Sequence, residues 1–244
     1  MDKGRNDVDA HFNQNLIDSG MMDPPRQNKV VSIASKIIYV LFSPKKFSYW
    51  LRTFFLDIKY GAYLGKRTSN GNYARGWWGS LNSNYDDLAE MFSQIAIRDN
   101  DIIVDVGCGK GRVFNFLLHR GYKNKLIGIE VDPVIAEATK KRLHKHPQIK
   151  IVIDAIENEG VLPLEGTIFY LANPFSELIV QNFADQLARK VKHGQYKILD
   201  RPLIVYYYCY YIDVFEANPL WDVKRLDTQF PAAIVYPRSE VAYT

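Results

Sequence analysis

The sequence predicts an α/β fold in which a mostly parallel sheet carries helices on both faces and ends in an antiparallel hairpin. Residues 101–133 have the pattern of a strand, a glycine turn, a helix and a second strand. Short β-branched runs and amphipathic runs then alternate as far as residue 208, with strands expected at 149–153, 167–172 and 202–208. A closing strand pair is expected at 221–227 and 232–237. A helical N-terminal extension precedes this domain.

The composition is that of a globular protein with mild positive charge. The chain has 244 residues, 47% hydrophobic and 24% charged, which excludes disordered and fibrous classes. The formal net charge of +4 is compatible with an anionic partner without requiring one. Two cysteines do not form a disulfide framework, and His144 and His146 lack the further ligands of a metal site. Without a signal-like segment or a membrane-spanning run, we expect a cytoplasmic protein.

Three segments are expected along the chain: a flexible tail at 1–28, a helical and aromatic extension at 29–83, and the α/β domain at 84–244. Apolar residues follow helical spacing in 29–41 and again after Ser43 and Pro44 as far as residue 58. The simplest interpretation packs these helices on the domain or on a second subunit, as in a homodimer. The alternatives are peripheral membrane contact through residues 30–60 and a basic surface for nucleic acid.

The stretch 105–111, with glycines at alternate positions, is the strongest chemical signal. Glycines allow a sharp turn and a close approach of the backbone to a ligand. In a parallel sheet, ligands bind beyond the carboxyl ends of the strands, where Asp105 and Glu130 are expected. Glu130 is placed to accept hydrogen bonds from ribose hydroxyls, and Asp105 suits a ligand with an amino group. Because Arg112 replaces the third glycine of the dinucleotide pattern, an NAD site is disfavoured.

This stretch resembles motif I of the class I S-adenosylmethionine (SAM) methyltransferases, whose pattern D-x-G-x-G-x-G is met in full. The resemblance implies a Rossmann-like fold with seven strands and SAM as the cofactor. It covers about residues 84–244. The positions that it implies for cofactor binding are Asp105, Gly107, Cys108, Gly109, Gly111, Glu130, Val131, Asp154, Ala155 and Asn173. Asp154 is also a plain cap for the turn after its strand, and Cys108 is expected to be a packing residue.

A second stretch follows the strand at 167–172. Asn173, Pro174 and Phe175 resemble motif IV of the amino-methylating members, which read Asn or Asp, Pro, Pro, aromatic. The resemblance implies that Asn173 accepts hydrogen bonds from a target amine and that the ring of Phe175 stacks on the substrate. The single proline departs from the pattern of members that methylate adenine or cytosine. The alternative is that these residues only turn the chain before a helix.

Aromatic residues supply the remaining substrate candidates. The glycine- and aromatic-rich stretch 60–84 precedes motif I, a segment that often shapes the substrate entrance in the resembled family. From it and its borders we select Trp78 and Tyr85. Tyr207 belongs to the tyrosine run that ends the strand at 202–208. Lys110 and Arg112 remain without a role, and the Lys and Arg run of 133–144 is interpreted as a solvated face.

The sequence therefore predicts a SAM-dependent methyltransferase that acts on a nitrogen of a protein or a small-molecule amine. One alternative is a nucleic-acid N-methyltransferase, which the basic charge favours and the absence of a dense Lys and Arg patch disfavours. The other is a non-catalytic SAM-binding or membrane-docked partner protein.

Overall fold

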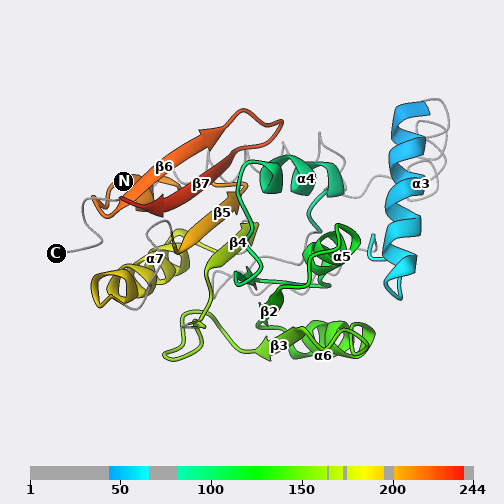
Figure 1. Ribbon diagram of the computed structural model, residues 1–244, viewed down its shortest axis with the longest axis horizontal. Helices are drawn as coiled ribbons and strands as arrows, with labels where there is room; N and C mark the ends of the chain where they lie inside the picture. Colours follow the sequence, from blue (N-terminus) through cyan, green and yellow to red (C-terminus); the bar gives the residue numbers. More distant parts are fainter. Residues whose placement is uncertain (1–43, 66–81, 164, 173–174, 195–200, 239–244) are drawn as a thin grey trace, which may run out of the picture. The chain divides into compact units, whose positions relative to one another are not determined.

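The computed structural model describes residues 44–65, 82–163, 165–172, 175–194 and 201–238 (Figure 1). The predicted tail at 1–28, the predicted helix at 29–41 and Trp78 lie outside the described residues. The chain divides into two compact units, Met1–Thr53 and Phe54–Thr244. The boundary between these units lies inside the predicted N-terminal extension, so the end of that extension belongs to the same unit as the sheet.

The second unit contains one seven-stranded sheet with the order β3-β2-β1-β4-β5-β7-β6. Strands β1 to β5 pair in parallel, whereas β7 is antiparallel to both β5 and β6. This is the predicted Rossmann-like sheet with its closing hairpin, and all seven expected strands are confirmed. The strands are β1 Ile102–Val106, β2 Lys125–Glu130, β3 Ile149–Ile153, β4 Ile168–Ala172, β5 Leu203–Tyr207, β6 Trp221–Leu226 and β7 Ala232–Pro237.

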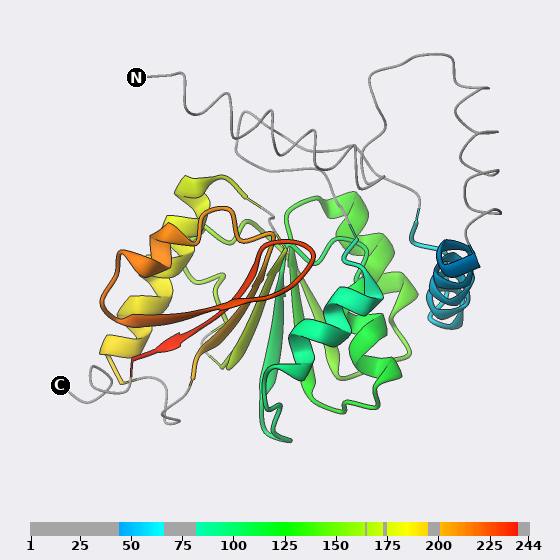
Figure 2. The same ribbon diagram turned by 90° about the horizontal axis from the view of Figure 1, so that it is seen from above.

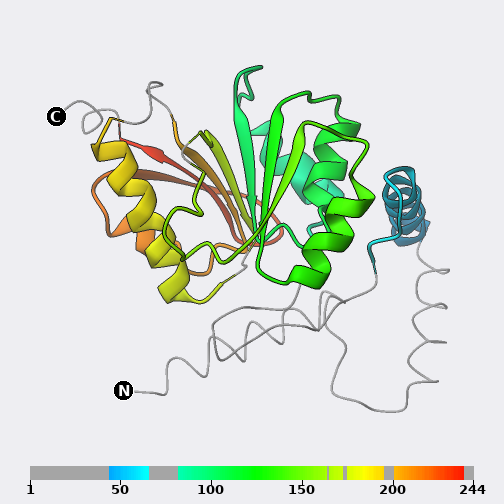
Figure 3. The ribbon, with the colours of Figure 1, turned by 90° about the horizontal axis from the view of Figure 1, so that it is seen from below.

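Helices cover both faces of this sheet (Figures 2 and 3). Helices α4, α5 and α6 lie on one face, and α7 and α8 lie on the other. The largest core cluster joins the α7 face to apolar side chains of β1, β4, β5 and β7. The described helices are α3 Pro44–Lys59, α4 Tyr85–Ser93, α5 Arg112–His119, α6 Pro133–Arg142, α7 Glu177–Lys192 and α8 Asp213–Glu216. The short α8 was not predicted.

Side-chain caps explain where the helices next to the cofactor edge begin. Asn84 accepts a hydrogen bond from the Asp86 amide at 2.8 Å at the start of α4. Asp132 accepts from the Val134 amide at 2.8 Å and precedes the proline that opens α6. Helix α4 ends at Ser93.

Helix α3 carries large apolar side chains that are exposed. No helix in the described parts of the chain has the length and apolar character needed to cross a membrane. Membrane contact through residues 30–60 stays a prediction, as does the cytoplasmic location. The exposed side chains are Phe47, Trp50, Leu51, Phe55 and Ile58.

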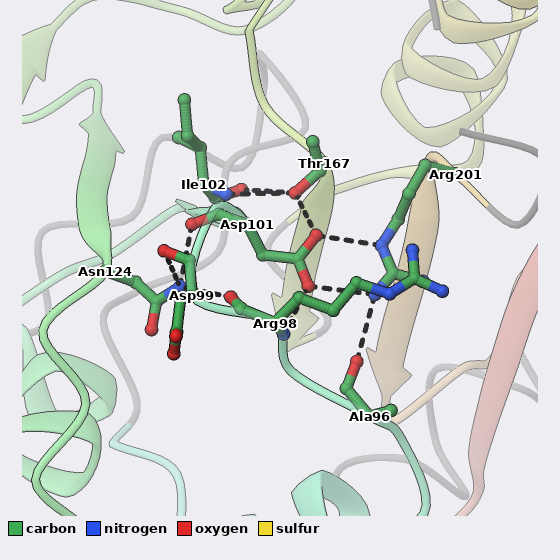
Figure 4. A network of polar contacts seen from close by, with 8 residues as sticks. All are labelled: Ala96, Arg98, Asp99, Asp101, Ile102, Asn124, Thr167 and Arg201. Carbon is green, nitrogen blue, oxygen red and sulfur yellow. Dashed lines mark hydrogen bonds and ion pairs between the residues drawn. The ribbon is translucent and has the colours of Figure 1, made fainter. Parts of the chain in front are cut away.

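A buried network joins the amino ends of β1, β4 and β5 (Figure 4). The Asp101 carboxylate accepts hydrogen bonds from Arg201 Nε at 3.0 Å and Nη2 at 2.9 Å, and from Thr167 Oγ1 at 2.8 Å. The Asp101 and Arg201 side chains are 0% and 2% exposed. Burial raises the pKa of Asp101, but hydrogen bonds from Arg201, the Arg98 amide and Thr167 outweigh it, so the pKa lies below its usual range.

Asp101→Ala should lower the free energy of unfolding by about 3–5 kcal/mol at pH 7, because it removes the carboxylate that neutralises the buried Arg201 guanidinium. A carboxyl with a lowered pKa stabilises the fold above its unfolded-state pKa, and this contribution is lost as the pH falls through the folded-state pKa. The difference between wild type and variant should therefore shrink below about pH 4. Urea unfolding at several pH values measures it.

The exposed pair Lys125–Glu165 is the control, since its side chains are 48% and 46% exposed. Glu165→Ala should cost less than about 1 kcal/mol. An equal loss from both variants would contradict the assignment of a stabilising role to the buried network.

Candidate cofactor site

The carboxyl ends of β1 and β2 form the candidate site. Asp105 lies on β1, with Gly128 of β2 and Tyr170 of β4 as its register partners. A Cβ atom on Gly128 would come within 2.7 Å of Cys108 Sγ, so the thiol fills the space that this glycine leaves. Burial raises the pKa of Cys108 well above its usual range, which keeps the thiol protonated. Cys108 is therefore a packing residue, as predicted.

The turn after β1 needs its glycines. Gly107, Gly109 and Gly111 have φ angles of 77°, 50° and 73°, in the left-handed region that side chains disfavour. The amides of Gly107 and Cys108 both donate to the Ile129 carbonyl at 2.9 Å, which fastens the turn to the end of β2. The turn then leads directly into α5, so backbone amides are available beside a ligand at this edge.

Glu130 holds the turn from the end of β2. Its Oε2 accepts from the Gly109 amide at 2.8 Å, and its Oε1 accepts from the Asp132 amide at 2.9 Å. Burial raises the pKa of Glu130, and these two amide hydrogen bonds oppose that rise. Each carboxylate oxygen keeps a further lone pair that can accept a ribose hydroxyl. The predicted ribose acid is thus placed beside the glycine turn.

Asp105 carries a buried oxygen without a partner. Asp105 is 3% exposed, and its Oδ2 has no hydrogen-bond partner in the described structure. Burial and the nearby Glu130 carboxylate raise its pKa well above the usual range. An unpaired buried carboxyl costs free energy, so such a group fits a ligand that brings a positively charged donor. The α-ammonium group of SAM is a donor of this kind.

Asp154 and Ala155, the residues predicted to contact adenine, follow β3, the strand next to β2. Ile153 of β3 is the register partner of Glu130, and Asp154 follows it. Asp154 Oδ1 accepts from the Ala155 amide at 2.8 Å and from Asn158 Nδ2 at 2.7 Å. Asp154 therefore caps its turn, which was the alternative interpretation, and its adenine contact stays a prediction. The same holds for Ala155, which is buried, and for Val131, which is half-buried.

The second predicted motif begins after β4, which lies between β1 and β5. Asn173 and Pro174 lie outside the described residues. Phe175 is 6% exposed and belongs to the core cluster that contains α7. This burial favours a core-packing role for the ring over the predicted stacking on a substrate.

Two predicted substrate residues are buried instead of lining an open cleft. Tyr85 is 5% exposed, and its hydroxyl donates to Asp57 Oδ1 at 2.7 Å. Tyr207 is 1% exposed, and its hydroxyl donates to Asp87 Oδ2 on α4. A buried tyrosine is stable when its hydroxyl has a partner, and both rings find one within the protein. Their burial favours a structural role for both rings, and their contact with a substrate stays a prediction.

Sequence reasoning missed Asp57, Arg112 and Arg142. Arg112 had no predicted role, and Arg142 was assigned to a solvated face. In the structure Arg112 pairs with Asp57 at 2.7 Å, and Arg142 donates to the Lys110 carbonyl of the turn at 2.6 Å. The available signal was that Asp57 is the one acid within the sequence of α3.

Comparisons with known proteins identify a methyltransferase domain in the chain. A family model described as a methyltransferase domain matches residues 103–194. A malonyl-[acyl-carrier protein] O-methyltransferase of Ilyobacter polytropus is 24% identical over 102 residues, 40% of this chain and 38% of that protein. A putative methyltransferase of Invertebrate iridescent virus 6 is 26% identical over 84 residues, 34% of this chain and 31% of that protein. The matches therefore span about a third of each relative.

One solved structure shows the same fold, and a second is reported beside it. A dimethyladenosine transferase from Plasmodium falciparum superposes with a TM-score of 0.50 at 17% identity, covering 68% of this chain and 66% of that one. An RNA methyltransferase from Salinibacter ruber, solved with S-adenosylhomocysteine, gives a TM-score of 0.48 at 16% identity and covers 64% of this chain and 93% of that one.

The sheet order defines a Rossmann-like domain, and its glycine turn and two carboxylates lie at the edge where such sheets bind ligands. Residues 103–194 form a methyltransferase domain, which agrees with the resemblance to the class I SAM-dependent methyltransferases. The predicted resemblance is confirmed for this domain, and SAM is the cofactor that the resemblance implies.

Asp105→Asn should weaken SAM binding at least tenfold, about 1.4 kcal/mol, because the amide cannot form a charge pair with the ammonium group. In the wild type, SAM binding should strengthen as the pH rises above about 4 through the raised pKa of Asp105, because only the ionised form makes that pair. Isothermal titration over a pH series measures both effects.

The contribution of Asp105 to the free energy of unfolding should fall as the pH rises, whereas its contribution to SAM binding should grow. A carboxyl whose pKa is raised on folding opposes folding once the pH exceeds its unfolded-state pKa. Asp105→Asn should therefore gain stability relative to wild type as the pH rises. If SAM affinity has the same pH dependence in the Asn variant, Asp105 does not bind the ammonium group.

Proposed function

We propose that this protein is a SAM-dependent methyltransferase that methylates a nitrogen atom of a protein or a small-molecule amine. The observation that carries the methyl-transfer part is the buried, unpartnered Asp105 oxygen beside the Glu130-held glycine turn. The choice of a nitrogen acceptor rests on Asn173 and Pro174, which follow the central strand β4.

SAM supplies an electrophilic methyl group on a positively charged sulfur when it is bound. In this proposal Asp105 holds the ammonium end, the glycine turn allows close approach, and Glu130 orients the ribose. These groups bind and orient the cofactor. Because the two carboxylates are buried, few water molecules can compete with the cofactor for them. Positioning and desolvation therefore supply most of the expected rate.

A nitrogen acceptor must present its lone pair toward the methyl group. The Asn173 side chain is an amide, whose oxygen accepts a hydrogen bond from an amine N–H and so fixes the direction of the lone pair. Asn173 follows β4 in the sequence, and β4 pairs with β1, which supports this role. Because Phe175 packs in the core, we assign no substrate contact to its ring.

A nucleic-acid N-methyltransferase is the second candidate. The sequence pI of 8.8 favours it, since the phosphate backbone attracts positively charged proteins. The single proline in the stretch 173–175 counts against adenine or cytosine as the target. A non-catalytic SAM-binding protein is the third possibility, and the experiment below separates all three.

Purified protein incubated with methyl-labelled SAM and a cell extract should transfer label to an acceptor, with SAM binding in the micromolar range. Protease sensitivity, nuclease sensitivity or passage through an ultrafiltration membrane assigns the label to a protein, a nucleic acid or a small amine. Glu130→Ala should weaken SAM binding at least tenfold, because the Gly109 and Asp132 amides lose their acceptor.

Asn173→Ala is the paired variant for the acceptor. It should lower kcat while leaving the SAM dissociation constant unchanged, because Asn173 is proposed to contact only the amine. Label that nuclease alone removes would favour the second candidate. SAM binding without any transfer would favour the non-catalytic one, and no SAM binding by the wild type would refute the proposal.

A further inference from the structure

The stretch Asp57–Leu64, which precedes the Rossmann-like sheet, is tied to the glycine turn by buried polar contacts. We propose that this stretch positions the turn for cofactor binding, with Arg142 and Arg112 as the positioning residues that join the two. The inference rests on the proposed function, since it concerns the same SAM site. Neither arginine contacts the two site carboxylates through any hydrogen bond in the described structure.

Arg142 holds the turn and the stretch with one guanidinium group. From the last residue of α6, its Nη2 donates to the Lys110 carbonyl at 2.6 Å. Its Nη1 donates to the Tyr60 carbonyl at 2.6 Å and to Asn115 Oδ1 at 2.9 Å. Because a guanidinium is planar and rigid, it fixes the separation of these carbonyls in a way that a lysine ammonium cannot.

Arg112, which directly follows the last glycine of the turn, is held by an ion pair. Its Nη2 contacts Asp57 Oδ2 at 2.7 Å, and the two side chains are 9% and 0% exposed. Asp57 also accepts from the Leu64 amide at 3.1 Å and from the Tyr85 hydroxyl at 2.7 Å. The carboxylate thus organises its own stretch and holds the start of α5 at the same time.

Further contacts hold the middle of the turn. Lys110 Nζ donates to the Leu64 carbonyl at 3.3 Å, and Thr139 Oγ1 donates to the Gly109 carbonyl at 2.9 Å. A turn with left-handed glycines has many alternative conformations when nothing holds it, and ordering it on binding weakens affinity. Residues that hold the turn before the cofactor arrives should therefore strengthen cofactor binding.

The competing explanation is that these contacts only stabilise the fold. The Asp101–Arg201 pair provides a matched control, because both of its side chains are also buried (Figure 4). Asp101 precedes β1, whereas the glycine turn follows the other end of this strand. Breaking it should destabilise the protein without changing the turn. The two explanations therefore differ in cofactor affinity and agree in stability.

The experiment is isothermal titration of the full chain with SAM, for wild type, Asp57→Asn, Arg142→Lys and the control Asp101→Asn. Urea unfolding and hydrogen exchange of the peptide 105–112 are measured on the same samples, at a temperature where all are folded. Asp57→Asn and Arg142→Lys should bind SAM about tenfold more weakly and exchange faster in that peptide. Asp101→Asn should lose stability and keep its SAM affinity within about twofold.

The outcomes are distinguishable. If the wild type fails to bind SAM, the proposed function fails and takes this inference with it. If the wild type binds and both turn variants bind equally well, or if Asp101→Asn weakens binding as much as they do, the inference alone is overturned. Should Asp57→Asn not fold, Arg142→Lys decides the matter, because it leaves the Asp57–Arg112 pair intact.

Discussion

The parallel pairing of β1 with both β2 and β4 is the constraint on which the site depends. It aligns Asp105 with Gly128 on one side and with Tyr170 on the other, and it brings Glu130 to the same edge. A shift by one residue would turn Asp105 to the opposite face, into the apolar cluster against α7. The register thus decides whether the carboxylates face a cofactor or the core.

Among the described residues, the buried aspartates Asp57, Asp101 and Asp105 show how differently one side chain is used. Asp57 and Asp101 each have an arginine at hydrogen-bond distance, 2.7 Å and 2.9 Å away. Asp105 has no cation beside it, and its Oδ2 lacks a partner in the described structure. Asp57 and Asp101 find their counterion within the protein, whereas Asp105 retains an unmet interaction that a ligand can satisfy. Stability and binding are therefore assigned to opposite ends of β1.

Local patterns predicted most of the fold. The strands and the glycine turn were recognisable because hydrophobic runs and glycine spacing are properties of neighbouring residues. The missed features join distant residues: Arg112 pairs with Asp57 across 55 positions, and Tyr207 pairs with Asp87 across 120. Nothing in the sequence around Tyr207 distinguishes a buried, bonded hydroxyl from one in a cleft. Helix α8 has four residues, too few to show a helical period.

The Asp57–Arg112 pair also restricts how this sequence can diverge. Replacement of either residue alone leaves a buried charge without its counterpart, so intermediates between two viable sequences are disfavoured. Relatives should therefore keep both residues or exchange both together, and a relative without the stretch 57–64 should lack the arginine after the glycine turn. The residue at position 112 then identifies which members of the superfamily carry such an N-terminal stretch, even where that stretch has diverged beyond recognition.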